Sequence, residues 1–334
     1  MADPSYSTLP NTPFDTISRI QYSPTDPNKL LVSAWDSTVR FYHAGEPNDK
    51  PSEQLVKFEH RSPLLTCCFS DATHGFSGGL DATIRHLDIG TERITTVGSH
   101  TDAVSGLLFS ENIVVSGSWD CTLRLWDPRS TTAQQTSTST ADRVYAIDMT
   151  GHNIVVAMAS RLFHIYDIRK MSEPAQQRES SLKYMTRSLA CMADGQGFAA
   201  ASVEGRIAVE YFDQSPAVQS KKYAFKCHRQ TVDDVDHVYP VNALAFHPVY
   251  NTFASGGSDA TVSIWDHKVK KRLRQYSKFG NPVGTLAFNC DGTRLAVGVG
   301  YNWDLGERGM HEKPGTEIGI RKLGDEVKPK NWTG

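Results

Sequence analysis

One pattern recurs seven times along the 334 residues and constrains the fold more than any other feature. Each copy has a short apolar segment, a gap, a second apolar segment that ends in small residues, a tight turn, and a third segment of alternating character. In the third copy, for example, residues 104–109 precede residues 114–127. The seven turns are centred on Asp36, Asp81, Asp120, Ser160, Glu204, Asp259 and about Tyr301.

The spacing of these turns predicts the architecture. They follow one another at roughly 40–45 residues, with one longer interval before Asp259, and this period with four short strands per copy is typical of a β-propeller. Segments 92–97 and 271–276 are examples of the fourth strand. We therefore predict an all-β, seven-bladed propeller over residues 14–323, a lead-in over 1–13 and a flexible tail over 324–334.

Three further expectations concern segments outside the regular pattern. Residues 7–14 are candidates for the outer strand of the last blade, which would close the ring. Residues 131–141 are rich in Ser, Thr and Gln and are predicted to form a loop. The acidic segment 231–237 accounts for the longest interval between turns, and it is either a loop that contacts a partner or a simple insertion.

Composition predicts a chain with no general attraction to polyanions. The net charge is −2, so direct binding of nucleic acid is not expected, and any basic site must be local. The first residues lack the basic and apolar regions of a secretory leader, and no apolar run approaches the ~20 residues of a membrane span. We expect the nucleus or cytoplasm, no membrane association, and six cysteines that are reduced core thiols.

Motifs for catalysis or cofactor binding are missing from the sequence. It contains no phosphate-binding glycine loop, no GxGxxG, HExxH or GxSxG pattern, and no Cys/His set with metal-ligand spacing. We therefore predict that the protein is not an enzyme and that it holds no cofactor or metal. Binding of partners at one rim of the propeller is the better-supported hypothesis.

The third segments of two copies resemble WD40 repeats. They end in Trp126-Asp127 and in Trp265-Asp266. The resemblance also covers a histidine before the first strand of a repeat, here His60, His100 and His228. A turn aspartate can accept hydrogen bonds from nearby backbone N–H groups and from such a histidine. We expect this structural role for Asp36, Asp81, Asp120 and Asp259.

Two tryptophans stand directly before turn aspartates. Trp35 and Trp119 occupy positions where other copies have Leu80, Val203 and Ser258. A large aromatic side chain at an exposed turn is a typical anchor of an interface, because covering it removes much apolar surface from water. The alternative is that each tryptophan only packs on a neighbouring blade.

Cations gather around the fifth copy. Lys183, Tyr184 and Arg187 precede or begin its first strand, Arg206 follows its turn, and Arg229 leads into the next copy. Propeller geometry predicts that all of them lie on one face across adjacent blades. They form either a solvated charged rim or a clamp, since arginine can bind carboxylate or phosphate with two hydrogen bonds.

Several segments resemble one branch of the WD40 proteins, the Bub-three family of mitotic checkpoint proteins. They are residues 178–187, 203–211, 221–229 and 239–247, and the likeness extends over residues 14–323. The resemblance implies a non-catalytic adaptor of the spindle assembly checkpoint, in the nucleus and at kinetochores in mitosis. It would be a monomeric propeller within complexes with the checkpoint kinase Bub-one and with Mad-three or BubR-one.

The resemblance also implies roles for single residues. The kinases would be bound through their GLEBS motifs, with Arg187 pairing with GLEBS glutamates and Lys183, Tyr184, Trp35 and Trp119 contacting the same peptide. Arg206 and Arg229 would contact the phosphothreonine of phosphorylated MELT repeats in the kinetochore scaffold.

Two other functions remain alternatives. The related messenger-RNA export propeller binds a nucleoporin GLEBS motif and shares the Glu-Gly-Arg and Cys-His-Arg segments. A substrate receptor of a ubiquitin ligase would need an adaptor-binding helix outside the propeller, and the sequence shows none.

Overall fold

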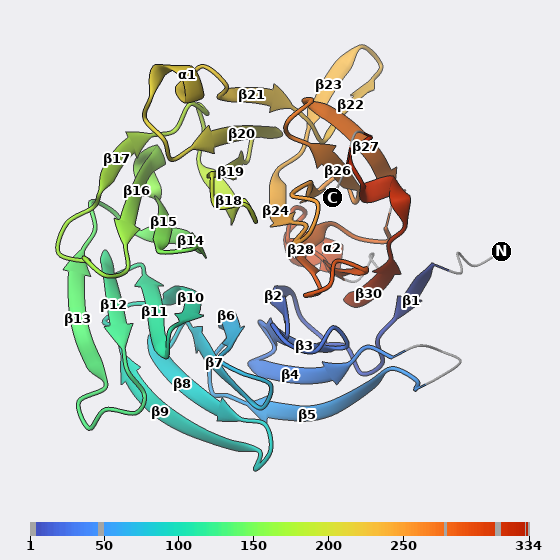
Figure 1. Cartoon of the computed structure of the whole chain (residues 1–334). Coiled ribbons are helices and arrows are strands. Elements are labelled where there is room, and N and C mark those ends of the chain that lie inside the picture. Colours follow the sequence, from blue (N-terminus) through green and yellow to red (C-terminus); the bar gives the residue numbers. More distant parts are fainter. Residues whose placement is uncertain (1–4, 46–49, 277–278, 311–314, 331, 333–334) are drawn as a thin grey trace.

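A computed structural model describes residues 5–45, 50–276, 279–310, 315–330 and 332. These residues form seven four-stranded antiparallel sheets that stand as blades around a central axis, together with one two-stranded sheet (Figure 1). The prediction of an all-β, seven-bladed propeller is therefore confirmed.

Within each blade the strands follow one another outward from the axis. The first three blades are β2 (Ile17–Tyr22), β3 (Lys29–Ala34), β4 (Thr38–His43) and β5 (Glu53–Glu59); β6 (Leu64–Phe69), β7 (His74–Gly79), β8 (Thr83–Asp88) and β9 (Arg93–Ser99); and β10 (Val104–Ser110), β11 (Ile113–Ser118), β12 (Thr122–Trp126) and β13 (Gln134–Ser139). Blades four and five are β14 (Val144–Thr150), β15 (Asn153–Met158), β16 (Leu162–Asp167) and β17 (Gln176–Glu179); and β18 (Thr186–Cys191), β19 (Gly197–Ser202), β20 (Arg206–Tyr211) and β21 (Tyr223–Lys226).

The sixth blade is followed by a seventh that takes its outer strand from the other end of the chain. The sixth contains β24 (Val241–Phe246), β25 (Phe253–Gly257), β26 (Val262–Asp266) and β27 (Lys271–Tyr276), and the seventh contains β28 (Val283–Phe288), β29 (Arg294–Val299), β30 (Glu317–Lys322) and β1 (Tyr6–Thr8). In the pairing of β1 with β30, Tyr6 lies opposite Arg321. Hydrogen bonds between these two strands therefore join the ends of the ring.

Blades pack through strands that are apolar on both faces. In β3, Leu30, Leu31 and Val32 are all fully buried, because neighbouring blades cover both sides of the sheet. Small residues let adjacent blades approach closely at the end of each second strand. A Cβ on Gly117 would lie 2.7 Å from Cγ1 of Val144 in the next blade, which explains the small residues of the repeat.

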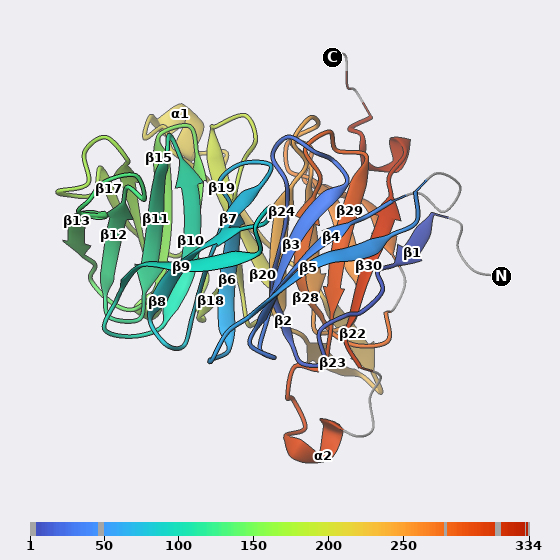
Figure 2. The same ribbon diagram turned by 90° about the horizontal axis from the view of Figure 1, so that it is seen from below.

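Two segments differ from the simple repeat. Residues 229–238 form a separate hairpin of β22 (Arg229–Val232) and β23 (Val235–Val238), and residues 301–310 are the described part of an insertion between β29 and β30. This segment contains the short helix α2 (Glu307–Met310), which projects from the same face of the ring as the hairpin (Figure 2). The remaining short helices are α1 (Pro216–Gln219), η1 (Ala159–Arg161) and η2 (Asp325–Val327).

One expectation about an irregular segment is wrong. The predicted loop 131–141 contains β13, which pairs along β12 as the outer strand of the third blade. Its polar residues are accepted there because the strand is exposed on its outer side. The predicted flexible tail contains η2, whose Val327 is buried and accepts a hydrogen bond from Thr252 Oγ1 at 2.9 Å.

The cysteines are all free thiols, and their burial varies. Cys67, Cys68, Cys191 and Cys227 are buried, whereas Cys121 is half-buried and Cys290 is exposed. The expectation of core thiols therefore holds for four of the six. In the part of the chain that the structure describes, no helix is long and apolar enough to cross a membrane.

Candidate peptide-binding face

A cavity of about 1170 Å³ runs along the axis and is lined by the innermost strand of every blade. Strand β2 begins where β3 ends, since Ile17 lies opposite Ala34, and the same holds in each blade. The strand starts and the repeat turns therefore open on one face of the ring, which we call the turn face. Trp35, Trp119 and Arg187 line the cavity where it meets this face.

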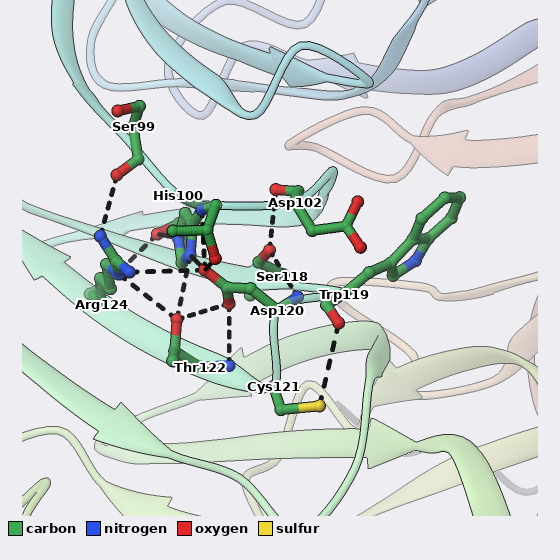
Figure 3. A network of polar contacts seen from close by, with 12 residues as sticks. Ser99, His100, Asp102, Ser118, Trp119, Asp120, Cys121, Thr122 and Arg124 are labelled. Carbon is green, nitrogen blue, oxygen red and sulfur yellow. Dashed lines mark hydrogen bonds and ion pairs between the residues drawn. The ribbon is translucent and has the colours of Figure 1, made fainter.

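The two predicted tryptophans are held by their backbones rather than by their rings. The N–H of Trp35 donates to Thr16 O at 2.9 Å, and that of Trp119 donates to Ala103 O at 3.0 Å. The Trp35 side chain is exposed and that of Trp119 is half-buried. The indole of Trp119 points away from the polar network of its own turn (Figure 3). Both rings are thus available to a ligand at the cavity.

The turn of the third blade is closed by a dense polar network (Figure 3). The carboxylate of Asp120 accepts hydrogen bonds from the N–H and Oγ1 of Thr122, at 3.0 and 2.6 Å, and from the N–H of Thr101 at 3.1 Å. His100 Nδ1 lies 2.9 Å from Asp120, and the Arg124 guanidinium lies 3.4 Å away. Only 4% of the Asp120 side chain is exposed.

Burial and hydrogen bonding decide the protonation of this network. Burial opposes ionisation of Asp120, but the hydrogen bonds from Thr122, Thr101 and His100 outweigh it and lower the pKa to about 2. Burial lowers the pKa of His100, and Asp120 offsets this only in part. A neutral imidazole can donate from Nδ1 to Asp120 and accept at Nε2 from Ser116 Oγ, 2.7 Å away. Ser116 Oγ in turn accepts from Trp126 Nε1 at 2.8 Å.

The other predicted turn aspartates use parts of the same arrangement. Asp259 accepts from His228, which lies 2.8 Å away, and from the N–H of Thr261. Asp36 and Asp81 instead bind an arginine four residues later, Arg40 and Arg85 respectively. His60 contacts Ser77 at 2.9 Å in the second blade. In the fourth blade Ser160 replaces the aspartate and donates to Asp142 Oδ2 at 2.7 Å.

Arg187 is the second residue of β18 and lies at the mouth of the cavity. Its Nε is 3.5 Å from Asn242 Oδ1, and no carboxylate pairs with it in the described part of the chain. The surrounding protein lowers its pKa, although its side chain is open to solvent. The guanidinium can therefore donate hydrogen bonds to a carboxylate of a ligand. Such an ion pair would offset the partial desolvation of the arginine.

Lys183, Tyr184 and Met185 precede β18 on the same face, and all three are exposed. The backbone N–H of Lys183 donates to Glu204 Oε1 at 3.3 Å, which fixes the path of the chain beside the fifth turn. The Tyr184 ring is 58% exposed and Met185 lines the cavity. Of the residues expected to contact the GLEBS peptide, Trp35, Trp119 and Arg187 line the cavity, from blades one, three and five, whereas Lys183 and Tyr184 precede its lining on the same face.

Arg206 and Arg229 lie apart from Arg187 and meet at the fifth turn. Arg206 Nε is 3.6 Å from Glu204 Oε2, and Arg229 Nη2 donates to the backbone oxygen of Glu204 at 2.8 Å. The Nε atoms of both arginines are buried, and within the described residues they donate no hydrogen bond. The structure therefore divides the predicted cations into one at the cavity mouth and two around Glu204.

Backbone geometry brings Arg206 and Arg229 together. Gly205 has a φ of +61°, and a Cβ there would lie 2.8 Å from Cys227 O and 3.0 Å from Tyr239 O. Only glycine fits this turn without strain, and it brings β20 against the chain that leads to Arg229. Lys226 lies opposite Arg206 in the pairing of β20 with β21, which adds a third cation to this part of the rim.

Several residues of this face were not identified from the sequence. Glu204 was recognised only as a turn position, and Lys226 only as part of a basic segment. Trp303, in the insertion of the seventh blade, also lines the cavity and is 50% exposed. The sequence feature that could have indicated Trp303 is a large aromatic residue in a segment that departs from the repeat. Among the described residues, no group of three or more His, Cys, Asp or Glu side chains could hold a metal ion.

Comparison with known proteins gives a consistent result. The family model described as "WD domain, G-beta repeat" matches residues 91–127 and 220–266. The mitotic checkpoint protein BUB3.1 of Arabidopsis thaliana is 44% identical over 96% of this chain and 94% of its own length. The mitotic checkpoint protein bub-3 of Caenorhabditis elegans is 41% identical over 99% and 97% of the two chains. The mRNA export factor GLE2 of Chaetomium thermophilum is 33% identical over 96% and 92%.

Proposed function

The chain belongs to the Bub-three family of mitotic checkpoint WD40-repeat proteins, and on this premise we propose that it is a non-catalytic adaptor that binds two kinds of peptide on its turn face. The first is the GLEBS motif of the checkpoint kinases Bub-one and Mad-three or BubR-one. The second is the phosphorylated MELT repeat of the kinetochore scaffold. Contacts of these two kinds would recruit checkpoint kinases to kinetochores.

The separation of the cations is the observation that carries this proposal. Arg187 lines the same cavity mouth as Trp35 and Trp119, and a cation together with exposed aromatic rings suits an acidic peptide with large apolar side chains. Arg206 and Arg229 lie around Glu204, and two neighbouring guanidinium groups suit the compact, doubly charged phosphate of a phosphothreonine. Two chemically different sites on one face support an adaptor that holds two partners.

One binding experiment tests the phosphate half of the proposal. A phosphothreonine MELT peptide should bind more tightly than its unphosphorylated form, and Arg206→Ala or Arg229→Ala should remove that gain. A charge-assisted hydrogen bond contributes about 1.5–3 kcal/mol, so we expect a weakening of about tenfold or more. Calorimetry at fixed salt concentration measures it. Arg143→Ala is the matched control, because Arg143 is exposed in the connection before β14 on the same face.

The acidic half is tested by Arg187→Glu. This variant should weaken binding of a GLEBS peptide and leave the melting temperature nearly unchanged, since Arg187 has no carboxylate partner among the described residues. Equal affinity of the wild type for phosphorylated and unphosphorylated MELT peptides would contradict the first half. A large fall in the melting temperature of Arg187→Glu would assign this arginine to structure and contradict the second.

The similarity to the export factor supports a second candidate function. A protein 33% identical over most of both chains is named an mRNA export factor, so a nucleoporin GLEBS motif is an alternative ligand for the same cavity mouth. Co-purification from mitotic cells, with and without phosphatase treatment, separates the two. Recovery of checkpoint kinases, in the nucleus and at kinetochores, supports the first function, and recovery of a nucleoporin supports the second.

A further inference from the structure

The insertion in the seventh blade brings a third tryptophan to the cavity mouth. Trp303 lines the same cavity as Trp35, Trp119 and Arg187, but it comes from the segment between β29 and β30 rather than from a repeat turn. It is 50% exposed, and Leu305 beside it is 40% exposed. Large apolar side chains cost free energy when they face water, so a ligand that covers both would gain from removing them from solvent.

The conformation of Trp303 is itself unusual. Its φ is +61°, in the left-handed region that bulky residues rarely adopt. Residues in such conformations are often found at binding sites, where the surrounding structure imposes them. Here Tyr301 holds the backbone of Trp303 in this conformation. Its hydroxyl donates to Gly306 O at 2.7 Å and accepts from the N–H of Leu305 at 3.0 Å, so it closes the loop around Trp303. The Tyr301 and Trp303 rings lie 5.9 Å apart.

A chain of polar contacts connects this loop to Arg187. Asn242 Oδ1 lies 3.5 Å from Arg187 Nε, and Asn242 Nδ2 donates to Ser258 Oγ at 3.0 Å. Asn302 Nδ2 donates to the same Ser258 oxygen at 3.1 Å. Blades five, six and seven are thus joined at the mouth, with Arg187 at one end of the chain and the residue before Trp303 at the other. The insertion is held in a defined place relative to the cation.

We infer that residues 301–310 of the insertion form a third wall of the peptide site, in addition to the tryptophan turns of blades one and three and to Arg187 in blade five. In this third wall, Trp303 and Leu305 contact an apolar side chain of the same acidic peptide whose carboxylate pairs with Arg187. The inference rests on the proposed function, because the occupant is the same GLEBS-type peptide. It adds a specificity requirement. The ligand must place an apolar residue beside its acidic residue, at the side of the mouth formed by blade seven.

Calorimetric titration of the full-length protein with a synthetic GLEBS peptide of a checkpoint kinase tests this. Trp303→Ala should weaken binding about tenfold or more, because a central aromatic anchor contributes a large share of binding free energy. Leu305→Ala should weaken it less, and Trp303→Phe should retain most of the affinity. The matched control is Val249→Ala. Val249 is 49% exposed but lies between β24 and β25, on the face of the ring opposite the turn face. Its replacement should therefore leave the affinity for the peptide unchanged.

A double-mutant cycle shows whether the contact is direct. Each apolar residue of the peptide is changed to alanine and titrated against wild type and Trp303→Ala. Direct contact predicts that one peptide change loses its effect in the Trp303→Ala protein, while the others remain additive. Circular dichroism melting confirms that the variants fold. An unchanged melting temperature is expected, since Trp303 is half exposed.

The outcomes separate this inference from the proposed function. If wild type binds the peptide, Arg187→Glu weakens binding and Trp303→Ala does not, the inference is wrong and the proposed function stands. If Trp303→Ala weakens binding but no peptide residue couples to it, the direct contact is wrong. If the wild-type protein does not bind the peptide at all, the proposed function fails first, and the third wall fails with it.

Discussion

The turns of blades three and five occupy the same place in the repeat and use their charges in opposite ways. In blade three, Asp120 is almost fully buried, and His100, Thr101, Thr122 and Arg124 surround its carboxylate. In blade five, Glu204 takes the turn position and makes longer contacts, 3.3 Å to the Lys183 N–H and 3.6 Å to Arg206. One acid is surrounded by short hydrogen bonds, and the other has two neighbouring arginines whose buried Nε atoms make no hydrogen bond among the described residues.

This difference shows how a repeat protein can create a binding site without a new fold. In blade three the histidine, threonine and arginine consume the hydrogen-bonding capacity of the aspartate, so little remains for a ligand. In blade five the longer acid has no histidine partner among the described residues, and the buried Nε atoms of its neighbours Arg206 and Arg229 donate no hydrogen bond there. Structural turns are internally saturated, and the turn that we assign to binding is not.

The largest predicted effect concerns stability at the saturated turn. Asp120→Ala should lower the free energy of unfolding by about 3 kcal/mol, because it leaves Arg124 and several buried donors without their acceptor. Glu204→Ala should cost about 1 kcal/mol or less, because its contacts are long and few. Urea denaturation followed by circular dichroism measures both. Equal losses would show that the two turns are equally structural.

A smaller effect is the pH dependence that the histidine of blade three gives to the fold. Burial holds the pKa of His100 below its ordinary value, so below about 6.5 the unfolded chain binds a proton more readily than the folded one. His60, whose pKa burial lowers to about 4, acts in the same direction. The stability of the wild type should therefore fall as pH decreases from 7 to 5.

Variants assign this slope to residues. His100→Gln should make the decrease in stability between pH 7 and 5 shallower, although the variant is less stable overall. His237→Gln is the control, because His237 is exposed on β23 and its replacement should leave the slope as in wild type. A slope that His100→Gln does not change would contradict the view that a neutral imidazole is part of the saturated turn. Denaturation at several pH values provides the comparison.

The smallest predicted effect concerns binding at the unsaturated turn. Glu204→Gln should raise the affinity for a phosphothreonine MELT peptide about two- to fivefold, because it removes a carboxylate that competes with phosphate for Arg206. The gain should shrink at high salt and be absent for the unphosphorylated peptide. Calorimetry at two salt concentrations measures this. A loss of affinity would instead mean that Glu204 holds Arg206 in its binding orientation.

Segments that follow the repeat pattern were predicted better than segments that depart from it. The aspartates and histidines of blades three and six recur at fixed spacing, and this was sufficient to expect that they would meet. The strand β13 was missed because its Ser, Thr and Gln residues have no alternating apolar pattern. It forms because β12 offers an open edge whose backbone groups need partners.

Contacts between segments that show no sequence pattern also explain what was missed in the candidate site. The sequence identified Arg187, Arg206 and Arg229 as one group of cations on one face. The structure places Arg206 and Arg229 against Glu204, and Arg187 against Asn242 in the cavity. Trp303 was overlooked because the insertion that carries it follows no periodic pattern. Its place depends on Tyr301 and on the polar contacts across three blades.

The sequence by itself determined the seven blades, the turn residues and the local excess of positive charge, because each follows from short-range periodicity and from the chemistry of single residues. Only the tertiary structure decided which cations share an acid, which tryptophans face the cavity and where the insertion lies. These depend on closure of the ring, in which β1 pairs with β30 and residues far apart in the chain meet on one face. Local pattern fixes each blade, and the packing of blades fixes the site.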